Sequence, residues 1–192
     1  MEYVLLRLVH ILGLTLMTSG LIGVLLADLR SRQVRELVVF AEAVRSIAVC
    51  YDGLVVPGAV LLAGSGAWLI ADFYDGWAFV ETPWLAGMVA LFVFEFVEGN
   101  TVTRLYFLRL RRLTVEALRQ GRFTAELEQA RGETTPTFTH FLDLPMLFLI
   151  VALGVTRPDG WSLFLAGATM AIALATALTV ALPRLYPWGG KT

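Results

Sequence analysis

The sequence predicts an all-α, polytopic membrane protein that consists of a four-helix transmembrane bundle and a fifth, accessory transmembrane helix. Of its 192 residues, 57% are hydrophobic and 16% are charged, whereas soluble domains average about 45–50% and about 25%. The mean hydropathy is +0.72. The apolar residues are also gathered into stretches of about 20 residues, the length that a helix needs to cross a bilayer. Together these observations exclude a soluble globular domain.

Five apolar stretches reach this length, and we predict a transmembrane helix in each. They cover about residues 3–27, 47–71, 83–107, 137–156 and 161–182. Charged or turn-forming residues follow each of them, for example Asp28 after the first and Arg157 after the fourth. The fifth stretch contains no ionisable residue, and we therefore expect it to be accessory to the bundle. We expect a single domain, residues 1–192.

The basic residues predict the orientation of the spans. One side holds the segment between the first two spans, residues 108–135 and the C-terminal tail with Lys191. It carries all 15 Lys and Arg residues except Arg7 and Arg157. Because basic residues near span ends accumulate in the cytoplasm, we predict an outer N-terminus and a cytoplasmic C-terminus in a bacterial inner membrane. The lipid bilayer is the expected partner, and we expect no nucleic acid.

Two segments between the predicted spans are amphipathic. Residues 108–135 alternate apolar side chains with Arg and Glu at near-helical spacing. We expect this segment to extend the third span and then to lie along the cytoplasmic surface. Residues 32–46 are predicted to form a second amphipathic helix before the second span begins.

His10 is a candidate cofactor ligand in the outer half of the first span. An ionisable side chain at the centre of a bilayer costs at least about 2.5–3.5 kcal/mol, so it requires a partner or a function. Gly13, Met17 and Gly20 fall near the same helix face and would let a helix or a flat cofactor approach. Met88 of the third span lies at a similar depth, and a His/Met pair can ligate a haem iron. Alternatively, His10 is hydrogen-bonded inside the bundle.

A second group of polar residues lies in the predicted cytoplasmic half of the spans. It consists of Asp52, Glu95, Glu98, Asn100, Arg104, His140 and Asp143. Spacings of three residues place Glu95 with Glu98, and His140 with Asp143, on common helix faces. Three interpretations remain open. The first is a metal site with His140, Asp143, Glu98, Glu95 and Asp52 as candidate ligands. The second is a proton relay or polar pocket. The third is a buried network in which Arg104 pairs with Glu98 or Asp143, with Asn100 alongside.

Three short motifs carry a family resemblance. They are Val9-His10-Ile11-Leu12-Gly13 in the first span, Asp52 with Pro57-Gly58 in the second, and Val155-Thr156-Arg157-Pro158 after the fourth. Together they resemble a family of predicted bacterial integral membrane proteins whose domain has no assigned function. The resemblance covers roughly residues 4–158.

The first span is also similar to that of HemJ-type protoporphyrinogen oxidases and copper-resistance D-type membrane domains. The matching residues are His10, Ser19-Gly20 and Arg30. In those proteins the histidine of the first helix is associated with haem or metal, and the resemblance therefore implies that His10 is a ligand. Met17 and Thr18 stand where those proteins usually have a tryptophan, so protoporphyrinogen oxidation is not implied.

These observations lead to three hypotheses about function. The first is a membrane protein that binds b-type haem or a metal ion, through His10 and Met88 in the haem case, and acts in electron or proton transfer. If it is an enzyme, it is a membrane oxidoreductase, and its partner is a membrane redox protein or a second copy of the chain. The second is a transporter for a small solute or ion that uses the polar pocket of the cytoplasmic half. The third is a structural or assembly subunit of a membrane complex.

Overall fold

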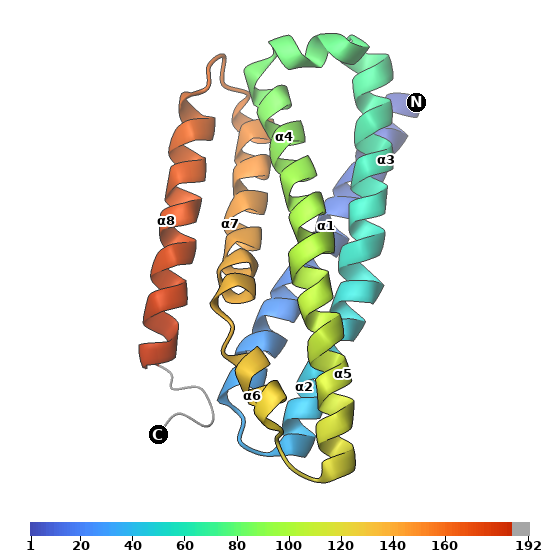
Figure 1. The fold of residues 1–192 in the computed structure, drawn as a ribbon. Helices are drawn as coiled ribbons and strands as arrows, with labels where there is room; N and C mark the ends of the chain where they lie inside the picture. Colours follow the sequence, from blue (N-terminus) through green and yellow to red (C-terminus); the bar gives the residue numbers. More distant parts are fainter. Residues whose placement is uncertain (186–192) are drawn as a thin grey trace.

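The computed structural model describes residues 1–185, and this part of the chain is helical and contains no strands. Five helical segments are long and apolar enough to cross a membrane. They are Glu2–Gln33, Leu37–Phe73, Pro83–Gln120, Ala125–Thr156 and Ser162–Leu185. The predicted fold class, an all-α polytopic membrane protein, is therefore confirmed (Figure 1). Lys191 and the rest of the tail lie outside the described residues.

Two of the five segments are long rods, each interrupted by one π-helical turn. The first contains α2 (Leu37–Cys50), the π-turn η1 (Tyr51–Val55) and α3 (Val56–Phe73). The second contains α4 (Pro83–Glu98), the π-turn η3 (Gly99–Thr103) and α5 (Arg104–Gln120). The sequence suggested an amphipathic helix ahead of the second span, but the two are continuous. The reason is that neither Gly nor Pro occurs between Leu37 and Tyr51 to stop the helix.

The rods extend well past the thickness of a bilayer. They contain 37 and 38 residues, which corresponds to about 55 Å at a rise of 1.5 Å per residue, whereas the hydrocarbon core is about 30 Å thick. Their surplus length, α2 and α5, lies together with α6 (Ala125–Arg131) at the bottom of Figure 1. We call this part of the bundle the basic end, because Arg45, Arg109, Arg111, Arg112, Arg119, Arg122 and Arg131 lie there.

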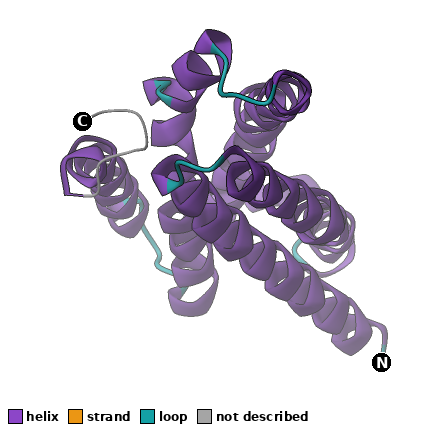
Figure 2. Ribbon diagram, turned by 90° about the horizontal axis from the view of Figure 1, so that it is seen from below, coloured by secondary structure: helices purple, strands orange, loops and turns teal. Residues whose placement is uncertain are grey.

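The remaining elements close the opposite end, which we call the far end. The short 3₁₀ helix η2 (Gly76–Glu81) joins α3 to α4 there. α1 (Glu2–Gln33) starts at the far end and runs obliquely across the bundle to the basic end (Figures 1 and 2). It packs closely on the first rod through glycines, and Met17, Leu21, Val24, Ile47, Val55 and Leu62 fill that interface.

α7 (Thr134–Thr156) lies inside the bundle, whereas α8 (Ser162–Leu185) lies at its edge. In the segment that contains α7, 50% of the most apolar stretch is buried inside the protein. The corresponding share for α8 is only 11%. The buried residues of α8 are Ala171 and Ala175, which face α7. Figure 2 shows this helix at the edge of the bundle. Most of its surface is therefore free to contact lipid.

At the basic end, α6 folds back onto the two rods and covers an apolar cluster. The buried members of this cluster are Phe40, Val44, Tyr106, Leu110, Ala117, Leu127 and Ala130. The Thr124 side chain caps α6 by accepting a hydrogen bond from the amide of Leu127 (3.3 Å). Arg131 ends the helix and is itself only 5% exposed, so the turn before α7 is firmly attached to the bundle.

Candidate functional site

Four ionisable side chains meet between α4 and α7, and we call them the carboxyl–histidine cluster. They are Glu95 and Glu98 of α4 and His140 and Asp143 of α7, with exposed fractions of 7%, 9%, 3% and 6%. Glu95 is twelve residues beyond the start of α4, which corresponds to about 18 Å of helix. Asp143 is thirteen residues before the end of α7, or about 20 Å. The cluster therefore lies deep inside the bundle rather than near its far end.

The carboxyl groups of Glu95 and Asp143 lie next to one another between α4 and α7, close enough for their side chains to interact. An ionised carboxylate has only acceptor oxygens, so two neighbouring carboxyl groups can hydrogen-bond to one another only when one of them carries a proton. Like charges held this close cannot both ionise. The pair can therefore hold one proton between two oxygens, which is an arrangement suited to taking up and releasing protons.

His140 and Glu98 lie on the basic-end side of this pair. The Nδ1 atom of His140 is 3.5 Å from Oδ2 of Asp143, which is longer than a well-formed hydrogen bond. The Nε2 atom of His140 is buried and has no hydrogen-bond partner within residues 1–185. Glu98 accepts a hydrogen bond from the Thr103 hydroxyl at 2.8 Å. The imidazole is therefore incompletely bonded beside an acidic pair.

Two hydroxyl groups extend the cluster toward the basic end. The Thr103 Oγ1 atom, already bonded to Glu98, lies 3.3 Å from Oγ1 of Thr139. The sequence interpretation missed both threonines, because a hydroxyl in an apolar span gives no signal that separates it from helix packing. Thr139 directly precedes His140 in the sequence, but this position becomes informative only after the structure has shown the cluster.

The π-turns η1 and η3 lie beside the cluster and are joined by one hydrogen bond. The Tyr51 hydroxyl donates to the carbonyl oxygen of Gly99 at 2.8 Å. A π-turn leaves backbone groups without their usual helical partners, and such turns occur frequently at functional sites. Tyr51 thus holds the two rods together next to Glu98. No periodicity in the sequence indicates either π-turn.

Three of the residues expected in this layer lie outside the cluster. Asp52 is exposed, and it lines a cavity of about 30 Å³ together with Arg104 and Arg111. Arg104 forms no ion pair with Glu98 or Asp143, which the third interpretation, a buried ion-pair network, would need. The Asn100 amide donates to the carbonyl of Phe96 within its own helix at 2.8 Å.

The candidate metal ligands do not form a metal site in the described part of the chain. No group of three or more His, Cys, Asp or Glu side chains there has the spacing needed to hold an ion. Asp52 is exposed, and His140 is the only residue of the carboxyl–histidine cluster that could supply a nitrogen ligand. The described residues therefore contain a buried pair of neighbouring carboxyl groups beside a histidine, and no group of three or more candidate ligands that could hold a metal ion.

His10 lies at the interface of α1 and α3, where it is half-buried. Its Nδ1 atom is 2.9 Å from the Ser65 hydroxyl, which itself donates to the carbonyl of Leu61 at 2.5 Å. Because the hydroxyl proton is used in that bond, Nδ1 must be the donor to Ser65. The proton of a neutral His10 is then on Nδ1, and the Nε2 lone pair is left free.

Met88 lies at a different helix interface from His10. It packs on α7, where a side-chain carbon added to Gly154 would come within 3.1 Å of its methyl group. Met88 packs against the buried apolar side chains between α4, α7 and α8. The two expected haem ligands are therefore not brought together.

Comparison with known proteins identifies the family but no characterised relative. No curated protein and no solved structure matches the chain. One family model matches residues 4–158, and its description is predicted integral membrane protein (DUF2269). This match spans most of the chain, including nearly all of α1, the whole of α2 to α7 and the carboxyl–histidine cluster. The protein therefore belongs to this family of predicted integral membrane proteins, DUF2269.

Proposed function

We propose that this membrane protein binds and transfers protons through the carboxyl–histidine cluster. The observation that carries the proposal is the pair of buried, neighbouring carboxyl groups of Glu95 and Asp143. It is buried, and within residues 1–185 no Arg or Lys side chain forms an ion pair with it. Intramembrane carboxyl and imidazole groups are the usual components of proton relays in pumps and transporters. A purely structural role would be expected to provide a cationic partner.

The order of the groups gives the proposed path a direction. From the basic end, a proton would pass the Thr103 and Thr139 hydroxyls, then Glu98 or His140, and would reach the pair of Glu95 and Asp143. Beyond the pair, residues 83–94 of α4 and 144–155 of α7 contain no ionisable side chain. On these two helices, ionisable side chains therefore continue from the pair toward the basic end only. Such a half-path suits a site that loads a proton and couples it to another process, rather than a continuous proton wire.

Infrared spectroscopy of the protein in lipid nanodiscs tests the proposal. At pH 7 we expect the C=O stretch of a protonated carboxyl group, because two buried, neighbouring carboxyl groups do not both ionise. The double variant Glu95→Gln/Asp143→Asn should lose this band. Glu116→Gln/Glu126→Gln is the matched control, since it removes two exposed carboxyl groups, and it should keep the band. Wild-type protein without the band at pH 7 would contradict the proposal.

The geometry gives less support to solute transport. The two cavities described at the basic end are lined by neither Glu98 nor Asp143. A small-solute transporter would need a cavity that reaches these residues. An assembly role would rest on the lipid-facing surface of α8, for which the chain offers no partner-specific feature.

We also propose His10 as the ligand of a b-type haem, because its hydrogen bond to Ser65 is favourable for ligation. Metal-bound histidines commonly donate their other ring N–H to an oxygen atom, which fixes the tautomer. With Nδ1 as donor, the Nε2 atom would bind the iron. Met88 is not part of this proposal, because it packs on α7.

An absorption spectrum of the purified protein tests this second proposal. A Soret band is expected in wild-type protein and should be lost in His10→Ala. Met88→Ala should retain the band, since Met88 lies at another helix interface. A colourless preparation from cells supplied with haem precursors would refute haem binding and would leave the proton proposal untouched.

A further inference from the structure

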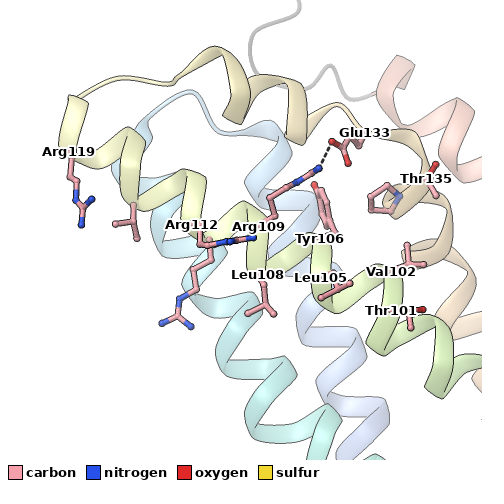
Figure 3. Close-up of a pocket in the computed structure, with 13 residues that line it drawn as sticks. Thr101, Val102, Leu105, Tyr106, Leu108, Arg109, Arg112, Arg119, Glu133 and Thr135 are labelled. Atoms are coloured by element: carbon pink, nitrogen blue, oxygen red, sulfur yellow. Dashed lines mark hydrogen bonds and ion pairs between the residues drawn. The ribbon is translucent and has the colours of Figure 1, made fainter.

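A broad groove at the basic end runs along α5 and the start of α7. Its volume is about 1170 Å³. Four arginines line it, namely Arg109, Arg111, Arg112 and Arg119. Figure 3 shows Arg109 reaching from α5 toward Glu133. Arg119 and Thr101 lie at opposite ends of the groove. The groove plays no part in the carboxyl–histidine cluster, since none of the cluster residues lines it.

The groove carries an excess of positive charge. Arg109 is ion-paired with Glu133, the one acidic residue of its lining. Arg119 has only a loose contact of 3.5 Å with Glu116, and both side chains are exposed. Arg111 and Arg112 are exposed and form no ion pair with any residue of the described chain. The complementary ligand is an anion, and guanidinium groups bind phosphate especially well.

The other half of the groove is apolar. Leu105 and Leu108 line it, although 58% and 44% of their surfaces are exposed. Both precede the free arginines along α5, and they therefore lie on the side of the membrane-spanning part of the rod. A soluble anion would leave this apolar surface uncovered. A ligand that joins an anionic head to an apolar chain would cover both halves.

We propose that this groove binds an anionic phospholipid of the surrounding bilayer. The phosphate group lies against Arg111 and Arg112, and an acyl chain runs along Leu105 and Leu108. Basic side chains next to membrane spans are a recurrent means of binding anionic lipid heads. The proposal does not depend on the function of the carboxyl–histidine cluster.

Thermal unfolding in mixed micelles tests the lipid site. Phosphatidylglycerol should raise the melting temperature of the wild-type protein with saturation, and phosphatidylcholine should not. An arginine near an anionic headgroup contributes about fivefold in affinity. Arg111→Gln/Arg112→Gln should therefore need about 25-fold more phosphatidylglycerol for the same rise. Arg111→Lys/Arg112→Lys keeps both charges and should restore most of the response.

Arg45→Gln/Arg122→Gln is the matched control. It removes the same charge from exposed positions of the basic end that do not line the groove. It should respond to phosphatidylglycerol as the wild type does. An equal loss in this control would mean that general surface charge attracts the lipid, and it would overturn the proposal. An unchanged response in Arg111→Gln/Arg112→Gln, or an equal stabilisation by soluble glycerol phosphate, would also overturn it.

Discussion

Replacement of Arg131 by methionine is expected to lower the free energy of unfolding by about 3–5 kcal/mol, the cost of breaking a buried charge network. The Arg131 guanidinium donates to the carbonyls of Ser31, Arg32 and Val34 at 3.0, 3.3 and 2.9 Å. Helix carbonyls at a C-terminus have no partner within their helix. Methionine would fill the space but would leave the end of α1 without its donors.

Aromatic rings make this position still less replaceable. The guanidinium lies 4.8 Å from the ring centre of Phe40 and 4.9 Å from that of Phe123. Such cation–π contacts contribute about 2 kcal/mol when they are desolvated. Glu128 completes the site with an ion pair at 3.0 Å. Arg131 therefore connects α6 to α1 and α2, which lie far from it in the sequence.

Reversible unfolding in detergent with increasing sodium dodecyl sulfate measures the effect. Arg122→Met is the matched control, because Arg122 is exposed and surface substitutions usually change stability by less than about 0.5 kcal/mol. Arg131→Lys should give an intermediate result, since lysine keeps the charge but cannot reach several carbonyls in a fixed plane. If Arg131→Met were as stable as Arg122→Met, the role assigned to this side chain would be wrong.

The second large effect is expected at Gly58, where α1 and α3 are in backbone contact. A side-chain carbon at this position would lie 2.5 Å from the amide nitrogen of Met17 and 2.8 Å from the carbonyl oxygen of Gly13. Backbone atoms cannot rotate away, so the two helices would have to separate. We expect Gly58→Ala to destabilise the protein by about 1–3 kcal/mol, the usual cost of overpacking. Gly58→Val should cost more.

Gly64 on the same helix provides the control for Gly58. A side-chain carbon there meets no atom within 4 Å. Because alanine favours helix over glycine, Gly64→Ala should leave stability unchanged or raise it by up to about 1 kcal/mol. Unfolding curves of the two variants should therefore move in opposite directions. A shift of the same sign and size would show that helix propensity, and not close contact, governs both positions.

The architecture could be predicted from the sequence to a large extent, because it depends on composition and length. Each apolar stretch has to be a helix in a bilayer, because only a helix pairs the backbone N–H and C=O groups of a single segment with one another. The boundaries were less predictable. α2 joins α3 in one rod because nothing between Leu37 and Tyr51 breaks a helix. Amphipathic and apolar segments of the same helix look like separate elements when only hydropathy is considered.

The candidate site was predicted in part. Spacings of three residues placed Glu95 with Glu98 and His140 with Asp143 correctly, because both pairs lie within regular helix. Asp52 and Arg104 lie outside the carboxyl–histidine cluster. Both lie in or next to a π-turn, and one extra residue rotates the following helix by about 100° relative to an α-helix. The depth of a side chain in the membrane can be predicted by counting residues along the helix. The direction in which it points around the helix axis cannot, when a π-turn intervenes.

The arginines show a different limit of sequence reasoning. As a group they indicate which side of the membrane the basic end occupies. Individually they differ widely: Arg131 is 5% exposed and bonded to backbone, whereas Arg111 and Arg112 are exposed. Long-range contacts determine this difference, and they connect α6 to the end of α1. No local pattern reveals such contacts.

The depth of the pair formed by Glu95 and Asp143 has an electrical consequence. With about 18–20 Å of apolar helix on its far side, the pair lies well inside the transmembrane electric field. A proton that moves between the basic end and this pair crosses about a third of the potential, which is worth about 0.8 kcal/mol at 100 mV. That energy corresponds to about a fourfold change in proton occupancy. In the proposed function, an energised membrane would therefore change how often the site is loaded at constant pH.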